Sequence, residues 1–192
     1  MQATCKVFLD AARSSAVYKV ASMAEIPVVF GYDMEDRLED GFLYRSARAE
    51  NPAAIFREGM REFCWMGRNV TGVDTLLEAA DAGDVQARYM CAMLLLTPGV
   101  GDEANAGRAV EMYANVLAAG KIELCRELFG QLFANSLLGI HPSDPGKPVV
   151  CQSSACPTRG TMGAANDLSS VSCVHCLAEF EVLYFFSLFT FR

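Results

Sequence analysis

Four cysteines toward the C-terminal end of the chain have the type and spacing to bind a metal ion. They follow the pattern Cys151-x4-Cys156-x16-Cys173-x2-Cys176, which makes two close pairs. Each short spacing lets two sulfurs reach one ion, and four thiolates complete a tetrahedral zinc site. The spacing leaves structural zinc and reduced thiols both open, with redox pairs as a third reading. A metal would also explain how the polar stretch 157–172 holds a shape with little to bury.

The same cysteines argue against catalysis. Four thiolates fill the coordination sphere of zinc and leave no open position for the water that a catalytic zinc needs. The two histidines are His141, in a proline-rich stretch, and His175, inside the last cysteine pair, and they suggest no nucleophilic triad. We therefore expect no catalytic residues and a protein that is not an enzyme.

The other four cysteines are expected to be structural. They stand singly in apolar segments of helical spacing, as buried small hydrophobic residues do: Cys5, Cys64, Cys91 and Cys125. No positively charged start with an apolar core and a cleavage site opens the chain, so we expect no secretory signal. Reduced thiols and a place in the cytoplasm or nucleus are the matching expectations.

Charge and hydropathy argue against two classes of partner. The 192 residues include 16 basic and 23 acidic ones, for a net charge of -7, and no cluster of Lys and Arg interrupts that balance. Nucleic acid is therefore not an expected partner, because phosphate contacts need concentrated positive charge. The apolar run 177–191 contains Glu179 and Glu181 and is shorter than the roughly 20 residues that cross a bilayer. We expect it to pack onto the protein, with an interfacial anchor as the alternative.

A pattern of small and large apolar residues occurs twice between residues 51 and 120. The first copy covers 51–60 and closes at 75–83, and the second covers 84–93 and closes at 111–120. Their offset drifts from 33 to 37 residues, in the range of helix-turn-helix repeats that stack into solenoids. Small residues would let helices approach closely while aromatic rings fill the groove; the alternative is two ordinary helical hairpins. The aligned positions are Ala54 with Ala87, Phe56 with Tyr89, and Gly59 with Ala92.

Helical spacing extends beyond the repeats. It predicts helices over 5–12, over 17–21 behind a cap at Ser14 or Ser15, over 35–48 and over 122–134. Asn51 suits an N-cap, and Gly83 and Gly120 suit the left-handed positions that close a helix. Three prolines and a glycine make 141–148 a linker.

The repeat resembles the SEL-like branch of the tetratricopeptide superfamily, whose second helix ends in a run similar to 76–83 followed by Asp84, Ala87 and Tyr89. With its flanking segments, the chain resembles a plant family of F-box proteins that carry such repeats and a C-terminal MYND-type zinc finger. Residues 5–12 and 17–23 are similar to the trailing half of the F-box, and the four spaced cysteines to the first two pairs of the finger. The resemblance reaches to about Cys176.

This resemblance implies an all-α protein built as a short helical-repeat array. It divides the chain into a partial F-box remnant at 1–30, SEL/TPR-like repeats at 35–138, a Pro-rich linker at 139–150, and a MYND-like segment with an apolar tail at 151–192. F-box proteins bind the Skp subunit of a cullin-RING ubiquitin ligase and present a protein substrate on their remaining domain. The implied function is a non-enzymatic adaptor, and the alternative is a standalone scaffold outside the ubiquitin system. The implied Skp contacts are Cys5, Phe8, Leu9 and Val17.

Both ends of the resemblance are incomplete. The Leu-Pro pair and first helix of an F-box do not precede residue 5, so we expect the first 30 residues to pack loosely on the repeats. The apolar run from Leu177 replaces the remaining Cys and His ligands of the finger. MYND-type fingers are cross-braced, so their first two cysteine pairs bind different zinc ions. A rearranged single site with all four thiols is the alternative.

Overall fold

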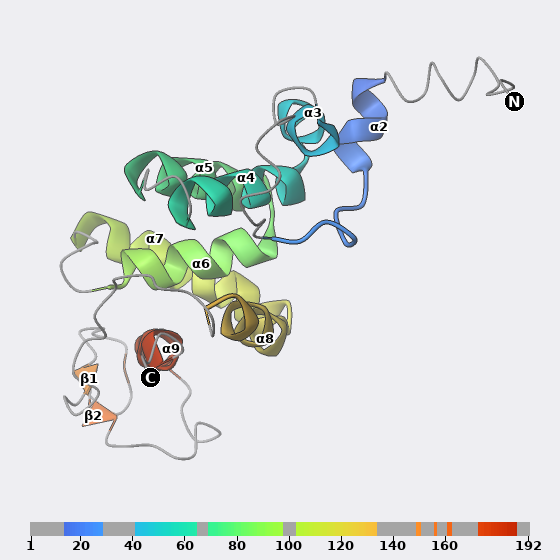
Figure 1. Cartoon of the computed structure of the whole chain (residues 1–192). Coiled ribbons are helices and arrows are strands. Elements are labelled where there is room, and N and C mark those ends of the chain that lie inside the picture. Colours follow the sequence, from blue (N-terminus) through green and yellow to red (C-terminus); the bar gives the residue numbers. More distant parts are fainter. Residues whose placement is uncertain are drawn as a thin grey trace, which may run out of the picture. The chain divides into compact units, whose positions relative to one another are not determined.

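The computed structural model describes residues 14–28, 41–64, 69–97, 103–133, 149–150, 156, 161–162 and 173–187 (Figure 1). Their secondary structure is helical apart from one ladder of two short strands, which confirms the expected helical-repeat class. The chain divides into two compact units, Met1–Arg88 and Tyr89–Arg192. The elements are α2 Ser15–Val20, α3 Phe42–Arg48, α4 Pro52–Cys64, α5 Asn69–Asp81, α6 Val85–Leu95, α7 Glu103–Ala118, α8 Ile122–Phe133, β1 Val149–Val150, β2 Thr161–Met162 and α9 Val174–Ser187.

In the first unit, α4 and α5 form an antiparallel hairpin whose backbones nearly touch. A Cβ placed on Gly59 would lie 3.0 Å from both the backbone nitrogen and Cγ of Leu76. A Cβ placed on Gly72 would lie only 2.6 Å from the backbone nitrogen of Phe63. The two glycines therefore act through their missing side chains, which allow the close approach that the sequence pattern predicted at Gly59.

The aligned repeat positions are buried in both copies. Ala54, Phe56, Ala87, Tyr89 and Ala92 are all 0% exposed, and Gly59 is buried too. Burial of every aligned pair supports the repeat register read from the sequence, because a shifted register would turn polar neighbours inward.

The helix ends of the two copies also correspond. Asn51 Oδ1 accepts a hydrogen bond from the backbone N–H of Ala54, at 3.3 Å, and so caps α4. Asp84 Oδ1 caps α6 in the same way through Ala87, at 2.8 Å. Gly83 and Gly120 end the preceding helices with φ of 106° and 64°, as expected for left-handed closing positions.

The segment before the repeats is held by side chains of α4. The Asn51 amide donates two hydrogen bonds of 2.9 Å to its carbonyls, and the Arg57 guanidinium donates two more, of 2.9 and 2.7 Å. The expected loose packing of this region is therefore wrong at Met23 and Val28, which are buried, whereas no residue of α2 is buried. The accepting carbonyls belong to Tyr18, Ala21, Ile26 and Met23.

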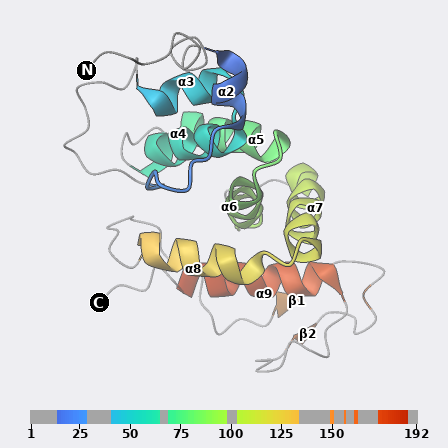
Figure 2. The same cartoon turned by 90° about the vertical axis from the view of Figure 1, so that its right-hand side faces the viewer.

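In the second unit, α9 lies beside α8 (Figure 2). The Phe185 ring is 0% exposed and lies 5.8 to 5.9 Å from the rings of Tyr89, Phe129 and Phe133. Contacts advance along both helices together, from Arg126 with Glu181 to Phe133 with Phe185, so α9 runs parallel to α8. This confirms the expectation that the apolar run packs onto the protein. Among the described helices, none is both long and apolar enough to cross a membrane.

A small ladder precedes α9. β1 pairs antiparallel with β2, with Val149 opposite Met162 and Val150 opposite Thr161. The last two residues of the expected 139–150 linker thus form a strand. The ladder closes the loop that contains Cys156, and β1 also contacts α9.

Glycine substitutions separate packing from helix propensity. We expect Gly59→Ala to lower the free energy of unfolding by about 1 to 3 kcal/mol, because its methyl group overpacks against Leu76. Gly72→Ala should cost at least as much, since the clash there is with backbone. Gly107→Ala is the control: nothing lies within 4 Å of its Cβ position, so it should stabilise α7 by about 0.5 to 1 kcal/mol. Urea unfolding midpoints measure all three, and equal effects would contradict the close approach.

Candidate metal centre and buried ion pair

Three of the four predicted metal ligands come together at the start of α9. The sulfurs of Cys156, Cys173 and Cys176 all lie within 4.8 Å of one another. Cys156 and Cys176 are 5% and 1% exposed, and their sulfurs are 3.5 Å apart, well beyond a disulfide bond of about 2.05 Å. Cys173 immediately precedes α9. Its carbonyl accepts a hydrogen bond of 3.0 Å from the backbone N–H of Leu177, in the first turn of the helix.

The cluster fits a zinc ion. Zinc binds thiolate at about 2.3 Å, so two sulfurs of a tetrahedral site lie about 3.8 Å apart. The Cys156–Cys176 separation of 3.5 Å is close to that value, and all three sulfurs lie within 4.8 Å of one another. One sulfur from the first pair joins both sulfurs of the second pair, which is the arrangement of a rearranged single site and differs from a cross-braced finger. Cys151 lies outside the described residues, next to the end of β1.

The other predicted site residues have mixed outcomes. Cys5, Phe8 and Leu9 lie outside the described residues, while Val17 stands on α2 with 44% of its surface exposed. Two of the cysteines expected to be structural are buried. Cys91 and Cys125 are 0% exposed, and burial raises the pKa of half-buried Cys64 to about 12. A thiolate is disfavoured at Cys64, so it is a poor metal ligand.

A second polar site lies two turns further along α9, at Glu181. Its carboxylate is fully buried and accepts three hydrogen bonds. Tyr89 Oη donates at 2.6 Å, Arg126 Nε at 2.9 Å and Arg126 Nη2 at 2.6 Å. Arg126 also pairs with exposed Glu123 at 2.6 Å and lies over the Tyr184 ring at 4.6 Å. One arginine of α8 is thus fixed by two carboxylates and a ring.

The charges at this site support one another. The hydrogen bond to Glu181 raises the pKa of Arg126, so the guanidinium stays protonated. Burial, with the neighbouring Glu181 charge, raises the pKa of Tyr89, so its hydroxyl remains a donor. Arg126 and Tyr89 therefore both keep the protons that they donate to the Glu181 carboxylate.

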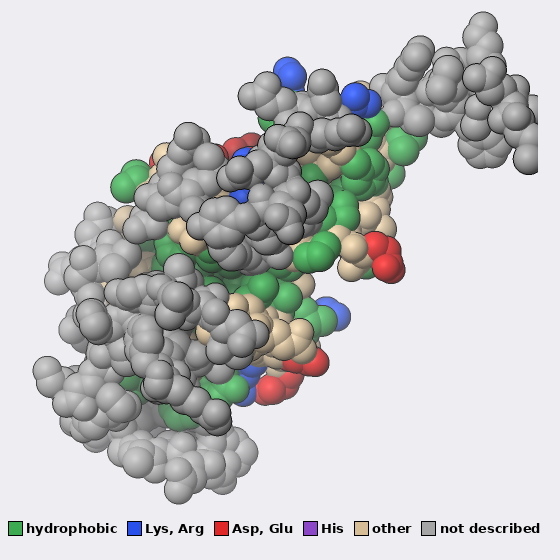
Figure 3. All heavy atoms as spheres, in the orientation of Figure 1, with side chains coloured by type: hydrophobic (Ala, Val, Ile, Leu, Met, Phe, Trp, Pro, Cys, Tyr) green, Lys and Arg blue, Asp and Glu red, His purple; other side chains and the backbone are tan. Residues whose placement is uncertain are grey.

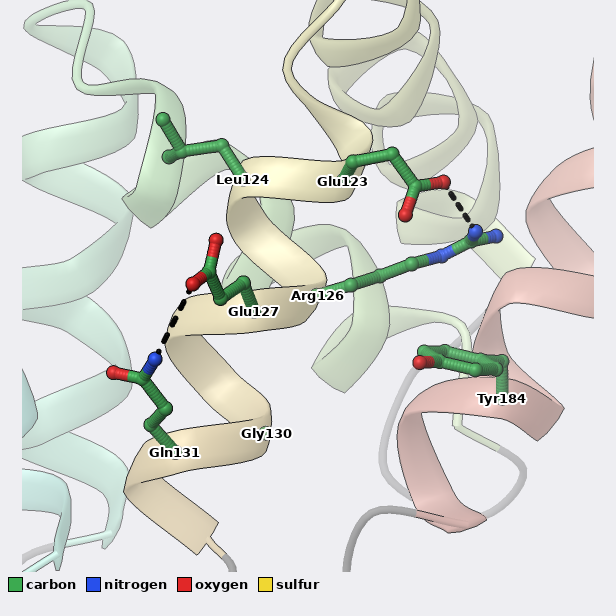
Figure 4. Close-up of a pocket in the computed structure, with 7 residues that line it drawn as sticks. All are labelled: Glu123, Leu124, Arg126, Glu127, Gly130, Gln131 and Tyr184. Atoms are coloured by element: carbon green, nitrogen blue, oxygen red, sulfur yellow. Dashed lines mark hydrogen bonds and ion pairs between the residues drawn. The ribbon is translucent and has the colours of Figure 1, made fainter.

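A shallow hollow of about 670 Å³ opens beside this anchor, over the outer face of α8 (Figure 4). Figure 4 shows the Tyr184 ring of α9 next to the Arg126 guanidinium, which lies over it at 4.6 Å. Gly130 of α8 also lines the hollow. Glu127 and Gln131 border the other side and are joined by a 3.4 Å hydrogen bond. Five of its residues are exposed: Glu123, Leu124, Glu127, Gln131 and Tyr184.

Sequence reasoning found the cysteines but not the Glu181 anchor. Glu181 entered only as a charge that interrupts an apolar run, and Tyr89 only as a groove-filling ring. A signal was present, because Tyr89 and Arg126 each stand six residues after a glycine that ends a helix, Gly83 and Gly120. The repeat therefore places them at equivalent positions, but their common partner could not be read from it.

Comparison with known proteins bears on the helices alone. A family model described as plant tetratrico peptide repeats matches residues 25–134. No curated protein and no solved structure matches the chain significantly. The family match covers α3 to α8 and ends before the thiol cluster and α9.

We expect the thiol cluster to bind one metal ion. Cobalt(II) added to the reduced chain should give thiolate charge-transfer bands and tetrahedral d–d bands, which zinc then abolishes. Cys156→Ser or Cys176→Ser should weaken binding more than about 100-fold, since even loss of a residue that only orients a ligand costs about 10- to 100-fold. Cys64→Ala is the control and should leave the spectrum unchanged. Cys151→Ser reports whether that thiol completes the site. Bands that persist when Cys156 and Cys176 are both replaced would exclude the thiol cluster as the metal site.

The two carboxylates of Arg126 should differ sharply in their effect on stability. Glu181→Gln removes the buried charge and leaves Arg126 under-paired, so we expect a loss of about 3 kcal/mol, at the lower end for broken buried pairs because Arg126 keeps Glu123. Glu123→Gln removes the exposed partner and should cost less than about 1 kcal/mol. Urea unfolding at neutral pH measures both, and equal losses would mean that Glu181 is not the anchor.

Proposed function

The chain belongs to the plant tetratrico peptide repeats family, and on that basis we propose that it is a non-enzymatic protein-interaction adaptor, related to the substrate-recognition subunits of Skp-cullin-F-box ubiquitin ligases. Repeats of this kind stack helical hairpins into binding surfaces. The observation that carries the adaptor role is the repeated packing itself: the same small and aromatic positions are buried in α4 and α6, with equivalent caps and closing glycines.

The N-terminal segment supplies a surface for the Skp-type subunit. No residue of α2 is buried, and Val17 and Val20 are 44% and 80% exposed, while Phe42 of the contacting helix α3 is 47% exposed. Hydrophobic side chains are visible over α2 in the space-filling view (Figure 3). Exposed apolar side chains at a defined place mark interaction sites when they cluster. In this proposal, Val17 and Val20 join Cys5, Phe8 and Leu9 in the Skp contact.

The way this segment is fixed suits an adaptor. Asn51 and Arg57, both on α4 or at its cap, hold residues 18–28 by four hydrogen bonds to backbone carbonyls. Such bonds constrain the direction in which α2 leaves the repeat. A ligase adaptor needs its ligase-binding helix and its substrate-binding repeats in a defined relation, so that ubiquitin reaches the substrate.

The substrate is a protein, and the thiol cluster has a structural role. A zinc ion at Cys156, Cys173 and Cys176 would stabilise the beginning of α9, because structural zinc sites contribute directly to folding. The proposed adaptor therefore needs no chemistry of its own: the repeats bind, and the metal holds the last helix.

Titration of the purified chain with a Skp subunit tests the ligase link. We expect a dissociation constant of about 1 µM or tighter. Val17→Asp together with Val20→Asp should weaken it at least about tenfold, because each change places a charge where an apolar contact forms. The control is Val70→Asp on α5, since Val70 is 78% exposed and lies far along the chain from the proposed contact.

Two outcomes would change the proposal. If the chain does not bind the Skp subunit, the standalone helical-repeat scaffold replaces the ligase adaptor. If all three aspartate substitutions weaken binding equally, the contact does not lie on α2, and the loss is an effect of charge on an acidic chain.

A further inference from the structure

α9 lies outside the repeat family yet is seated on the repeat helices. The family match ends at residue 134, one residue after α8. Ala178, Val182 and Phe185 of α9 are at most 3% exposed, and the Phe185 ring packs against the rings of Tyr89, Phe129 and Phe133. A segment added after the repeat therefore covers a face that the repeat by itself would leave open to water.

The anchor of α9 uses equivalent positions of two successive repeat helices. Tyr89 lies six residues after Gly83 on α6, and Arg126 lies six residues after Gly120 on α8. Both donate to the one carboxylate of Glu181, at 2.6 to 2.9 Å. One carboxylate thus accepts hydrogen bonds from the same position of two successive repeats. A helix bound to the repeat from outside could use the same two donors.

The face under α9 has a definite chemistry. It consists of Tyr89, Arg126, Phe129 and Phe133, which we call the α6–α8 face. Its three rings stack or pair at 5.5 to 5.8 Å, and its single cation stands at one edge. An aromatic surface with one arginine and one hydroxyl donor fits a helix that brings an acidic residue and, one turn later, an aromatic residue. α9 has that pattern in Glu181 and Phe185.

We propose that the α6–α8 face is a docking site for a helix of a partner protein with an acidic residue followed four positions later by an aromatic one, and that α9 occupies this site within the chain as a competitor. This inference rests on the proposed role of the repeats as an interaction scaffold, but not on the Skp link. The partner displaces α9 and takes over the bonds from Tyr89 and Arg126.

The buried arginine gives the site its selectivity. A helix without the acid would leave Arg126 covered and without its buried partner, which is strongly unfavourable. Competition with α9 sets the apparent affinity for a partner. The apparent dissociation constant equals the intrinsic one divided by the fraction of molecules in which α9 has left the site. Weakening α9 within the chain therefore strengthens binding of a helix added from outside.

A fluorescent peptide of residues 174–187, carrying Cys176→Ser, tests this competition against the full-length chain. We expect the Glu181→Gln chain to bind the peptide at least about tenfold more tightly than the unaltered chain. A Glu179→Gln chain is the matched control, because it loses the same charge from the same helix without touching the Arg126 contact, and it should bind like the unaltered chain. Equal affinities for all three chains would overturn the proposal.

Two further peptides separate the anchor from general charge. Peptides with Glu181→Gln and with Glu179→Gln have the same net charge, so only the first should lose binding to the Glu181→Gln chain, by about tenfold or more. Equal losses would mean that the peptide binds elsewhere.

The unaltered chain provides a test that does not depend on any variant folding. Nitrogen-15-labelled chain with excess unlabelled 174–187 peptide should shift the amide signals of residues 174–187 and of α8, while those of α4 stay in place. Unchanged α9 signals at saturating peptide would overturn the proposal. If the chain binds this peptide but no Skp subunit, the docking site is supported and the ligase link is excluded. If it binds a Skp subunit but not the peptide, the ligase link is supported and the docking site is excluded.

Discussion

A single buried carboxylate controls how the C-terminal half of this protein is arranged. Glu181 is 0% exposed, and withdrawing a carboxylate from water costs several kcal/mol unless donors replace the lost solvent. Tyr89 and Arg126 supply three such donors. Because they stand on two different helices, Glu181 is satisfied in one position only. That requirement fixes both the rotation and the axial position of α9.

The rotation of α9 needs such a device. Its sequence, VHCLAEFEVLYFFS, has apolar residues on every face, so hydrophobic burial alone would accept several orientations. A buried ion pair with a complete set of hydrogen bonds discriminates among them, since any other rotation leaves Arg126 or Glu181 covered and unpaired. The three cysteines at the start of the helix act in the same direction: a bound metal would hold its first turn while Glu181 holds its middle.

The first unit uses the same physical principle with backbone carbonyls in place of a carboxylate. Residues 21–28 form no regular ladder, and buried carbonyls there must find donors. Arg57, only 7% exposed, reaches two of them, and the Asn51 amide reaches two around α2. Asn51 caps α4 at the same time, so one side chain begins the repeat and fastens the segment before it. In both units, polar side chains of the repeat hold a segment that flanks the repeated helical hairpins.

The sequence by itself determined the repeat: its helices, the small residues Ala54 and Ala87, the cap at Asn51 and the closing glycines. These features follow from local rules, because helix periodicity, capping and positive φ depend on residues within a few positions of one another. Spacing also predicted that the cysteines at 156, 173 and 176 could share an ion. Only the tertiary structure decided that Glu181 meets Tyr89 and Arg126, and that Asn51 and Arg57 hold residues 18–28. Those contacts join residues 30 to 92 positions apart, and a buried polar group selects its partner by position in space, which no local pattern encodes.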